Sequence, residues 1–306
     1  MTPQFVSPQI EPQLDWKELI TALEQGHFAP RAEIADSFLY RGSDTLLSRA
    51  AWIDGMGALV KTATIFPANP KKGLASVNGA VSLFSDETGE LEAMVDFHLV
   101  TKWKTAGDSL LAASKLARPD SRKITLVGAG TVARSMHSAY RAIFPDAEFT
   151  IWNRSAPAAN AFARDLPRTQ IATDLEKAVR SADIVCTATM ATEPLIRGEW
   201  LQPGQHLDLI GAFRPDMREV DDEALRRACV FVDSRETTLA HIGELKIPLS
   251  QGVISHDDIL ADFYDFGSGQ FSRPDAKSIT IAKNGGGAHL DLMTSRYIFN
   301  RWIDGK

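Results

Sequence analysis

A short glycine-rich turn constrains what this chain can fold into more than any other feature. It reads Gly128-Ala129-Gly130-Thr131-Val132-Ala133 and directly follows the apolar stretch Ile124–Val127. The pattern G-x-G-x-x-G/A between a buried strand and the start of a helix is typical of a dinucleotide-binding βαβ unit. Gly128 permits the tight turn, Gly130 lets the backbone approach a pyrophosphate, and Ala133 keeps the helix close to the strand. The predicted cofactor-binding residues of this turn are Gly128, Ala129, Gly130, Thr131 and Ala133.

The segments around this turn alternate between strand-like and helical patterns. Apolar, strand-like runs occur at 123–127, 149–153, 170–172, 183–189, 206–212 and 229–233, with helical spacing between most of them. Strands that alternate with helices form a parallel sheet. Pro119-Asp120-Ser121 has the composition of a linker at the start of this region. We therefore predict an α/β fold with a Rossmann dinucleotide-binding domain over residues 121–285.

Residues 1–120 have a different pattern. A helix is expected over 15–25 with Asp15 as its N-cap, and a second helix over 99–117. Strand-like runs between them lie at 37–40, 45–50, 58–65 and 77–85, and a hairpin follows with its turn at 86–89. The segment 286–306 is an apolar-periodic helix, which we expect to pack on this first domain. The first domain is then discontinuous and of α+β type, with residues 1–120 completed by 286–306.

The end of the second strand of the dinucleotide-binding domain selects the cofactor. A site that prefers NAD places Asp or Glu there to hold the ribose 2′-hydroxyl. This chain has Asn153, Arg154 and Ser155 instead, which offer an amide, a guanidinium and a hydroxyl to a 2′-phosphate. We therefore predict NADPH as the cofactor, with NADH as the alternative. Thr187 and Thr189 follow a later strand, where hydroxyl groups commonly face the cofactor.

Composition and charge argue against several classes of function. The chain has 33 Lys plus Arg and 39 Asp plus Glu, and this net charge of −6 does not suit nucleic acid as a partner. The sequence contains no apolar run of about 18 residues or more, so we predict no membrane span. Residues 1–19 lack the pattern of a secretory signal. Cys186 and Cys229 lie in apolar stretches, as expected for reduced thiols, and no Cys or His pair has metal-ligand spacing. We expect a cytoplasmic protein with a small-molecule ligand.

Short motifs of higher specificity are spread over nearly the whole chain. The first domain contains Val60-Lys61-Thr62, Phe66-Pro67-Ala68-Asn69-Pro70, Gly73-Leu74-Ala75-Ser76-Val77-Asn78-Gly79 and Trp103-Lys104-Thr105-Ala106-Gly107. Ala117-Arg118-Pro119-Asp120, Gly211-Ala212-Phe213-Arg214-Pro215-Asp216-Met217-Arg218-Glu219 and Val232-Asp233-Ser234 follow. Together these motifs resemble the ornithine cyclodeaminase/mu-crystallin family. The resemblance implies a substrate-binding and dimerising first domain, a Rossmann domain, and imine chemistry beside a nicotinamide without a metal.

Departures from the family pattern indicate one branch of it. Cyclodeaminases carry a proton-handling carboxylate at the position of Phe213, and Asp216 matches instead a pattern of the reductase branch. The segment Asn153–Ser155 also resembles the NADPH-binding members. The resemblance therefore implies an NADPH-dependent reductase of a cyclic ketimine. Its substrate would be Δ1-pyrroline-2-carboxylate or Δ1-piperideine-2-carboxylate, and its product L-proline or L-pipecolate.

Three cations of the first domain are the predicted substrate-binding residues. Lys61 lies in the apolar strand GALVKTATI, where a lysine is out of place unless it is paired or functional. It is also the predicted catalytic residue, and it either binds the substrate carboxylate or protonates the imine. The resemblance implies that Arg41 and Lys104 bind the carboxylate, although cyclodeaminases have Arg where this chain has Lys104. The resemblance further implies cofactor contacts for Ser76, Thr105 and Asn284.

Three other functions stay open at this point. An ornithine cyclodeaminase would convert ornithine to proline and ammonia with catalytic NAD, and it would need another proton carrier such as Asp216. An alanine dehydrogenase would reductively aminate a keto acid. A nucleotide-binding protein without turnover would resemble lens crystallins, and the presence of Lys61 and Lys104 argues against it. By resemblance we expect a homodimer.

Overall fold

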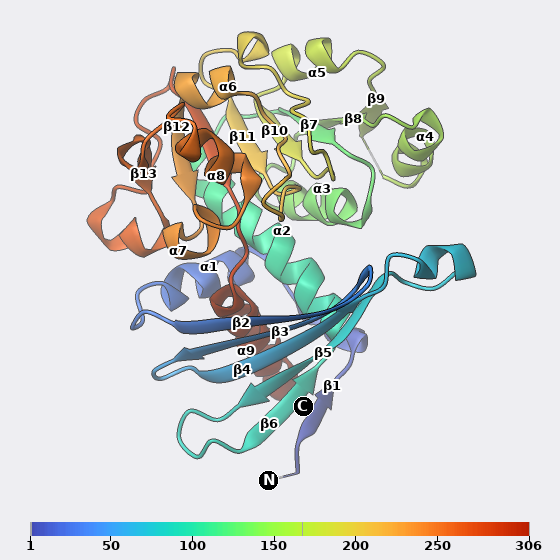
Figure 1. Ribbon diagram of the computed structural model, residues 1–306, viewed down its shortest axis with the longest axis vertical. Coiled ribbons are helices and arrows are strands. Elements are labelled where there is room, and N and C mark those ends of the chain that lie inside the picture. Colours follow the sequence, from blue (N-terminus) through green and yellow to red (C-terminus); the bar gives the residue numbers. More distant parts are fainter. Residues whose placement is uncertain (1, 167, 306) are drawn as a thin grey trace. The chain divides into compact units, whose positions relative to one another are not determined.

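The computed structural model describes residues 2–166 and 168–305. The predicted first domain begins at Met1 and ends at Lys306, and these two residues lie outside the described ones. These residues form two compact units (Figure 1). One unit contains residues 2–104 and 287–305, and the other contains 105–166 and 168–286. The chain passes from the first unit to the second within the long helix α2 (Phe97–Leu116), upstream of Pro119. Among the described helices, none combines the length and the apolar character that a membrane span needs.

The first unit is built on a six-stranded sheet with the order β1-β6-β5-β4-β3-β2. β1 pairs parallel with β6, and the other neighbouring strands pair antiparallel. The strands are β1 (Gln4–Val6), β2 (Glu33–Arg41), β3 (Asp44–Ile53), β4 (Gly57–Ile65), β5 (Val77–Phe84) and β6 (Leu91–Val95). The helices are α1 (Trp16–Gly26), α9 (Ala288–Asp304), the start of α2 and the 3₁₀ turns η1 (Pro8–Gln13) and η2 (Asn69–Lys72).

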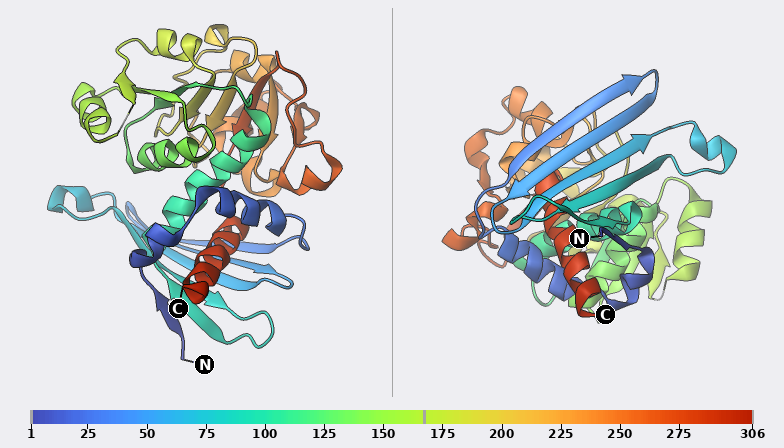
Figure 2. Two further views of the ribbon diagram at one scale, coloured as in Figure 1. Left: turned by 180° about the vertical axis from the view of Figure 1, so that it is seen from behind. Right: turned by 90° about the horizontal axis from the view of Figure 1, so that it is seen from below.

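One face of this sheet is covered by helices. α9 contacts β3, β4 and α1, and Figure 2 shows it lying across the sheet. Asp15 begins α1 as predicted, because its carboxylate accepts two backbone N–H groups of the next turn. Along β4, alternate residues are buried, among them Leu59, Lys61 and Ala63. The covered face is therefore apolar except where charged side chains enter it.

The second unit contains an eight-stranded parallel sheet with the order β13-β12-β14-β11-β10-β7-β8-β9. Its strands are β7 (Lys123–Val127), β8 (Glu148–Trp152), β9 (Thr169–Ile171), β10 (Ile184–Thr187), β11 (His206–Leu209), β12 (Ala228–Val232), β13 (Ile259–Ala261) and β14 (Ile279–Lys283). The helices are α3 (Thr131–Ile143), α4 (Ala156–Asp165), α5 (Leu175–Ser181), α6 (Asp222–Arg227), α7 (Arg235–Thr238) and α8 (Gly243–Ser250), with 3₁₀ turns η3 (Gly198–Trp200), η4 (His256–Asp258) and η5 (Phe263–Ser268). β10 and β11 are buried along their whole length, as expected for a parallel sheet that is covered on both faces.

The strand order of this sheet reverses beside β7. β8 and β9 follow on one side of β7, whereas β10, β11 and β14 follow on the other. Open α/β sheets bind ligands at the carboxyl ends of their strands at such a switch point. The glycine turn after β7 lies at this point, so the predicted Rossmann fold is confirmed.

Most of the predicted segments are helices or strands in the structure, with bounds within a few residues. β1, β13, β14 and the short helices between 235 and 268 were not predicted. β1 and β13 have only three residues each, which is too short for a periodic pattern to develop. β14 has only two large apolar residues, Ile279 and Ile281, and it ends in Lys283, so its local pattern is weak.

Candidate functional site

The glycine turn has the room that a bound pyrophosphate requires. Gly128 has φ of 111°, and a Cβ there would lie 2.5 Å from the carbonyl oxygen of Ala188, so only glycine fits. Gly130 is the N-cap of α3, and a Cβ added to it would meet nothing within 4 Å. Ala133 is buried beneath the helix start. The residues of the turn that are at least partly exposed are Ala129, Gly130, Thr131 and Val132. Open space in front of unpaired helix N–H groups suits an anion.

The loop after β8 presents no carboxylate to a bound nucleotide. The Asn153 side-chain amide donates to the Ser155 carbonyl oxygen at 3.1 Å and shapes the loop. Ser155 is the N-cap of α4, and its side chain makes no capping hydrogen bond. Arg154 is exposed. A guanidinium, a hydroxyl and a helix N-terminus are therefore available at the position where a 2′-phosphate would lie.

A buried carboxylate, Glu219, joins the ends of two strands of the second unit. Its Oε1 accepts the backbone N–H of Thr189 at 2.9 Å and its hydroxyl at 2.7 Å. Its Oε2 accepts the Thr187 hydroxyl at 2.8 Å and the Gly211 N–H at 2.8 Å. Thr187 is 1% exposed, so the structure gives its hydroxyl a buried partner in place of the predicted cofactor contact. Thr189 has the same partner from a half-buried position.

Two further buried charges support Glu219. Glu244 in α8 accepts the backbone N–H groups of Glu219 at 2.8 Å and Val220 at 3.1 Å. Burial, and then the nearby charge of Glu219, raise the pKa of Glu244 to about 7. Lys283, at the end of β14, is fully buried and donates to three backbone carbonyl groups at 2.7 to 2.8 Å. Burial lowers the pKa of Lys283, while the surrounding carboxylates oppose that shift.

The loop after β14 is held by a carboxylate of the neighbouring strand end. Asp233 Oδ2 accepts the N–H groups of Gly285 at 2.8 Å and Gly286 at 2.5 Å, and its Oδ1 accepts the Thr238 hydroxyl at 2.7 Å. Asn284, in this loop, is 3% exposed, and its Oδ1 has no hydrogen-bond partner within the described chain. Buried amide oxygens are nearly always hydrogen-bonded. An N–H donor such as a nicotinamide carboxamide fits this position.

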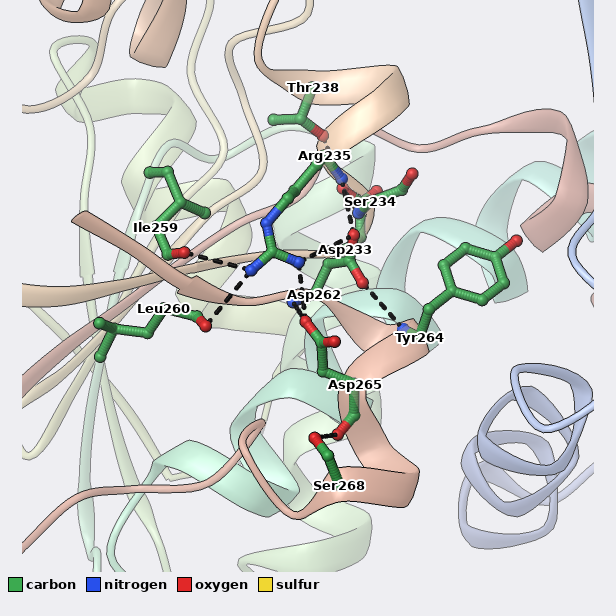
Figure 3. Close-up of polar contacts among 10 residues, drawn as sticks. All are labelled: Asp233, Ser234, Arg235, Thr238, Ile259, Leu260, Asp262, Tyr264, Asp265 and Ser268. Atoms are coloured by element: carbon green, nitrogen blue, oxygen red, sulfur yellow. Dashed lines mark hydrogen bonds and ion pairs between the residues drawn. The ribbon is translucent and has the colours of Figure 1, made fainter. Parts of the chain in front are cut away.

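The end of β12 that carries Asp233 is anchored by an arginine (Figure 3). Arg235 donates to Asp265 Oδ2 at 2.7 Å and to the Ile259 carbonyl at 3.2 Å. Its backbone N–H donates to Asp262 Oδ2 at 3.1 Å. These bonds tie the strand end to β13 and η5, so the scaffold fixes the position of the Asp233 carboxylate.

The first unit contains a buried cluster of charges on the covered face of its sheet. Lys61 is 7% exposed, and its Nζ donates to Asp291 Oδ1 of α9 at 2.8 Å. Arg49 lies directly opposite Lys61 on β3, with its guanidinium 3.6 Å from Asp291 Oδ2 and 2.7 Å from Asp36 of β2. The Lys61 ammonium also lies 5.0 Å from the centre of the Phe97 ring. Burial lowers the pKa of Lys61, and the charge of Asp291 opposes that shift.

Lys104 joins this cluster from α2 and carries an uncommitted charge. The residue is 9% exposed. Its positive charge lowers the pKa of Lys61 and contributes to lowering that of Asp291, so it lies within electrostatic reach of both. Among residues 2–166 and 168–305 the Lys104 ammonium has no hydrogen-bond or ion-pair partner. The cluster thus holds three cations and two carboxylates, with one positive charge in excess.

The structure does not bring Arg41 to Lys61. Arg41 is the last residue of β2, five positions from Asp36, which is about 16 Å along a strand. An odd offset also places its side chain on the opposite face of the sheet. There it is 79% exposed and pairs with Asp44 at 3.0 Å across the hairpin turn. Arg41 therefore lies outside the buried cluster, and Arg49 provides the guanidinium there.

The remaining predicted residues are distributed over both units. Ser76 precedes β5 in the first unit and is half-buried, with its carbonyl accepting the Phe66 N–H at 2.7 Å. Thr105 is half-buried in the part of α2 that belongs to the second unit. Phe213, at the position where cyclodeaminases have a carboxylate, is 56% exposed. Asp216 is exposed and is engaged by Arg214 at 2.9 Å through both oxygens.

Sequence reasoning missed the partners of the predicted residues. Asp291 is flanked by Leu290 and Leu292, so the criterion that singled out Lys61, a charge within an apolar stretch, also applies to it. Lys283 ends an apolar run in the same way. Arg49 carries no such signal, because only the pairing of β3 with β4 places it beside Lys61.

The second unit has a glycine turn at the switch point of its parallel sheet, and the first unit has a buried, net positive cluster. Together these features define a dinucleotide-dependent enzyme. Residues 50–306 match the ornithine cyclodeaminase/mu-crystallin family. The chain belongs to this family, which confirms the predicted resemblance.

Two pyrroline-2-carboxylate reductases and an alanine dehydrogenase are similar to this chain over nearly their whole length. A Delta(1)-pyrroline-2-carboxylate reductase of Paracoccus denitrificans is 48% identical over 303 residues, covering 97% of this chain and 96% of the relative. The structure of the Thermococcus litoralis Delta(1)-pyrroline-2-carboxylate reductase, in complex with NADH and L-proline, superposes with a TM-score of 0.91 at 26% identity over 99% of this chain and 98% of that one. An archaeal alanine dehydrogenase dimer with bound NAD superposes with a TM-score of 0.90 at 27% identity over 100% and 97%.

Proposed function

We propose that this chain is an NADPH-dependent reductase of a cyclic ketimine that carries a carboxylate. The observation that carries the proposal is the cluster around the buried Lys61, in which three cations face the buried Asp291 and the exposed Asp36. A buried excess of positive charge needs an anion, and the carboxylate of Δ1-pyrroline-2-carboxylate or Δ1-piperideine-2-carboxylate supplies one. The products are L-proline or L-pipecolate. The similarity to a reductase of this name at 48% identity supports the five-membered ring first.

Reduction of a carbon–nitrogen double bond requires few groups from the protein. The substrate carboxylate needs a cation, the imine nitrogen needs a proton, and water must be kept away. Lys61 and Lys104 supply the cations from the first unit. NADPH, when bound, supplies the hydride, and the glycine turn, the loop after β8 and Asn284 hold it on the second unit. No step of this reaction requires a metal ion.

The preference for NADPH over NADH is tested at the loop after β8. Arg154 is the cation available to a 2′-phosphate there, and a charge-assisted hydrogen bond contributes about 1.5–3 kcal/mol. Arg154→Ala is therefore expected to raise the KM for NADPH by about ten- to a hundredfold, with the KM for NADH nearly unchanged. Initial rates with each coenzyme measure this. Equal loss with both coenzymes would contradict the assignment of Arg154 to the 2′-phosphate. A wild-type protein with a lower KM for NADH would replace NADPH by NADH, which is present in the Thermococcus litoralis structure.

The residues around Phe213 weigh against a cyclodeaminase. Phe213 cannot exchange a proton, and Asp216 is exposed and already engaged by Arg214. A hydrogen bond from Arg214 is the main cause that lowers the pKa of Asp216, which makes it a weaker proton carrier. Among the described residues of this motif, neither therefore takes over the role that the cyclodeaminase carboxylate has.

A homodimer is part of the proposal. β2 carries Phe38, Leu39 and Tyr40, which are 48%, 63% and 73% exposed, on both faces of the strand. Exposed adjacent aromatic and aliphatic side chains mark an interaction surface, and the structure of the archaeal alanine dehydrogenase is that of a dimer. Static light scattering is expected to give twice the chain mass of 33.5 kDa. A cytoplasmic location goes with this proposal, because both cysteines are free thiols.

One panel of assays tests the function. The purified protein is mixed with NADPH or NADH and with the five-membered imino acid, the six-membered imino acid, pyruvate plus ammonia, or, with NAD, ornithine. Loss of the coenzyme absorbance with a cyclic imino acid is expected. Turnover of ornithine alone, or of pyruvate plus ammonia alone, would replace the proposal by a cyclodeaminase or an alanine dehydrogenase.

A further inference from the structure

The carboxylate of Asp291 lies between two cations that come from neighbouring strands. One oxygen is 2.8 Å from Lys61 Nζ and the other is 3.6 Å from the Arg49 guanidinium. The side chain is fully buried. Burial on its own raises a carboxyl pKa, but the charges of Lys61, Lys104 and Arg49 outweigh it and lower the pKa of Asp291. Asp291 is therefore a permanent anion that holds Lys61 in one place.

The charged and titratable groups around Lys61 come from every element packed on this face. β2 contributes Asp36 and β3 contributes Arg49, which pair with each other at 2.7 Å. α2 contributes Lys104, and α9 contributes His289 beside Asp291. Burial, and then the neighbouring positive groups, lower the pKa of His289 well below its usual value, so it adds no charge.

His27, at the end of α1, completes this set. Its ring lies 5.5 Å from that of His289, edge to face, and its Nδ1 lies 2.7 Å from the Leu23 carbonyl oxygen. Its ring packs against that of His289. Asp291 is thus the one carboxylate in direct contact with Lys61 among the described residues.

The two lysines of the cluster differ in how they are held. Lys61 Nζ is fixed by Asp291 and by the face of the Phe97 ring, 5.0 Å away. Lys104 has no such partner in the described chain, and its four-carbon stem leaves its ammonium able to follow a ligand. A proton donor must be fixed relative to its acceptor atom, whereas a cation for a carboxylate needs only proximity.

We propose that Asp291 is a positioning residue that divides the work between the two lysines: it fixes Lys61 as the proton donor to the imine nitrogen and leaves Lys104 for the substrate carboxylate. The inference rests on the proposed function. It assigns to each lysine the role that the sequence left open. Arg49 belongs to the same arrangement, because it holds the second oxygen of Asp291 and prevents that carboxylate from turning toward the substrate.

The reaction balances with these groups. The Lys61 ammonium gives one proton to the imine nitrogen, and the C=N carbon accepts a hydride from the reduced dinucleotide. The carbon–nitrogen double bond becomes a single bond, NADPH becomes NADP⁺, and Lys61 is left as a neutral amine. A proton from solvent then restores its charge. Asp291 stays ionised throughout and stabilises the ammonium that is formed again.

The test is the isosteric variant Asp291→Asn. Without the carboxylate, Lys61 stays buried beside Arg49 and Lys104, so its pKa falls further. The proton donor is then lost at a lower pH, and each unit of that shift reduces kcat about tenfold on the alkaline side. We expect kcat of the variant to fall at least about tenfold at pH 8 and to recover as the pH is lowered, with KM little changed.

A second readout does not depend on turnover. Neutral amines react with acetic anhydride and ammonium groups do not, so the pH dependence of Lys61 acetylation, followed by mass spectrometry, reports its protonation directly. In Asp291→Asn this profile is expected to move to lower pH by the same amount as the kcat profile. Glu92→Gln is the matched control, because it also removes a carboxylate that joins the sheet to α9, through Arg296 at 2.7 Å, without touching Lys61. Both profiles are expected to stay in place.

Two substitutions separate the roles of the lysines. Lys61→Arg keeps the ion pair with Asp291 but donates no proton, so kcat is expected to fall about a hundredfold or more in a folded protein that still binds NADPH. Lys104→Met is expected to raise KM with a smaller change in kcat.

An unchanged acetylation profile in Asp291→Asn overturns the inference. A shifted acetylation profile with an unshifted kcat profile overturns it as well, because Lys61 is then not the donor. If the wild-type protein reduces none of the imino acids, the proposed function fails, and the acetylation profiles still decide whether Asp291 controls the Lys61 ammonium.

Discussion

The two units each bury a group of charges, and they satisfy them differently. In the second unit, Glu219, Glu244 and Lys283 bond mainly to backbone N–H and C=O groups, with hydroxyl groups as further donors. In the first unit, Lys61 and Asp291 bond to side chains from separate elements, and Lys104 has no partner in the described chain. Backbone partners cannot move without unfolding a strand end. Side-chain partners and a spare cation can accommodate a ligand, so we expect the first cluster to bind and the second to hold the scaffold.

The largest effect expected from this comparison is on activity in the first cluster. Lys61→Met removes the proposed proton donor, and kcat/KM is expected to fall by about 10²- to 10⁴-fold, the usual contribution of general acid catalysis. Coenzyme absorbance with the cyclic imino acid measures it, and NADPH fluorescence checks that the dinucleotide still binds. Near-normal activity would show that another group donates the proton, and the two clusters would then not differ in function.

The equivalent change in the second cluster should affect stability. Lys283→Met leaves three carbonyl groups without a donor, and it leaves Glu219 and Glu244 without their cation. We expect the free energy of unfolding to fall by about 3–5 kcal/mol, measured by urea denaturation. A stable but inactive variant would show that Lys283 takes part in the reaction, and that the two clusters do not differ in function.

A smaller effect concerns pH. The pKa of Glu244 is raised from 4.5 to about 7 in the folded protein. At a pH between these two pKa values, Glu244 keeps its proton in the folded state and loses it in the unfolded state. Stability therefore falls as the pH rises through this window. Asp208, whose pKa burial also raises to about 7, acts in the same direction. We expect the Tm to drop by about a few °C from pH 5 to pH 8, and Glu244→Gln to flatten part of this slope. Asp208→Asn should remove the remaining part of this decrease of Tm with pH. If neither variant changes the decrease, other groups cause it.

The smallest effect is expected at Arg41. Its side chain is exposed on the other face of the sheet from Lys61, and exposed ion pairs contribute little. Arg41→Ala should change KM for the imino acid by less than about twofold. A large rise in KM would show that the carboxylate is bound outside the buried cluster.

Local patterns in the sequence predicted the parts of the molecule that short segments determine. The strand, glycine turn and helix at 123–143 form one continuous segment, and Lys61 is conspicuous within its own strand. The partner of Lys61 could not be found in this way, because Asp291 lies 230 residues further along the chain. Long-range packing alone brings these two together.

Arg41 shows a second limit of sequence reasoning. Side chains alternate between the faces of a strand, so the register of a hairpin decides which residues meet. Arg41 pairs with Asp44 across a two-residue turn, and this register puts Asp36 and Arg49 in the row of Lys61. A motif shows that an arginine is present near a turn. It does not show on which face of the sheet the side chain lies.

The placement of α9 has a consequence for how the enzyme matures during synthesis. The ribosome makes the six strands of the first unit early, but the helix that covers them and supplies Asp291 emerges only after residues 105–286. Until then Lys61 lies on an uncovered sheet without its counter-ion, while the second unit already has its whole sequence available for folding. This late segment therefore completes both the hydrophobic core of the first unit and its cluster of charges.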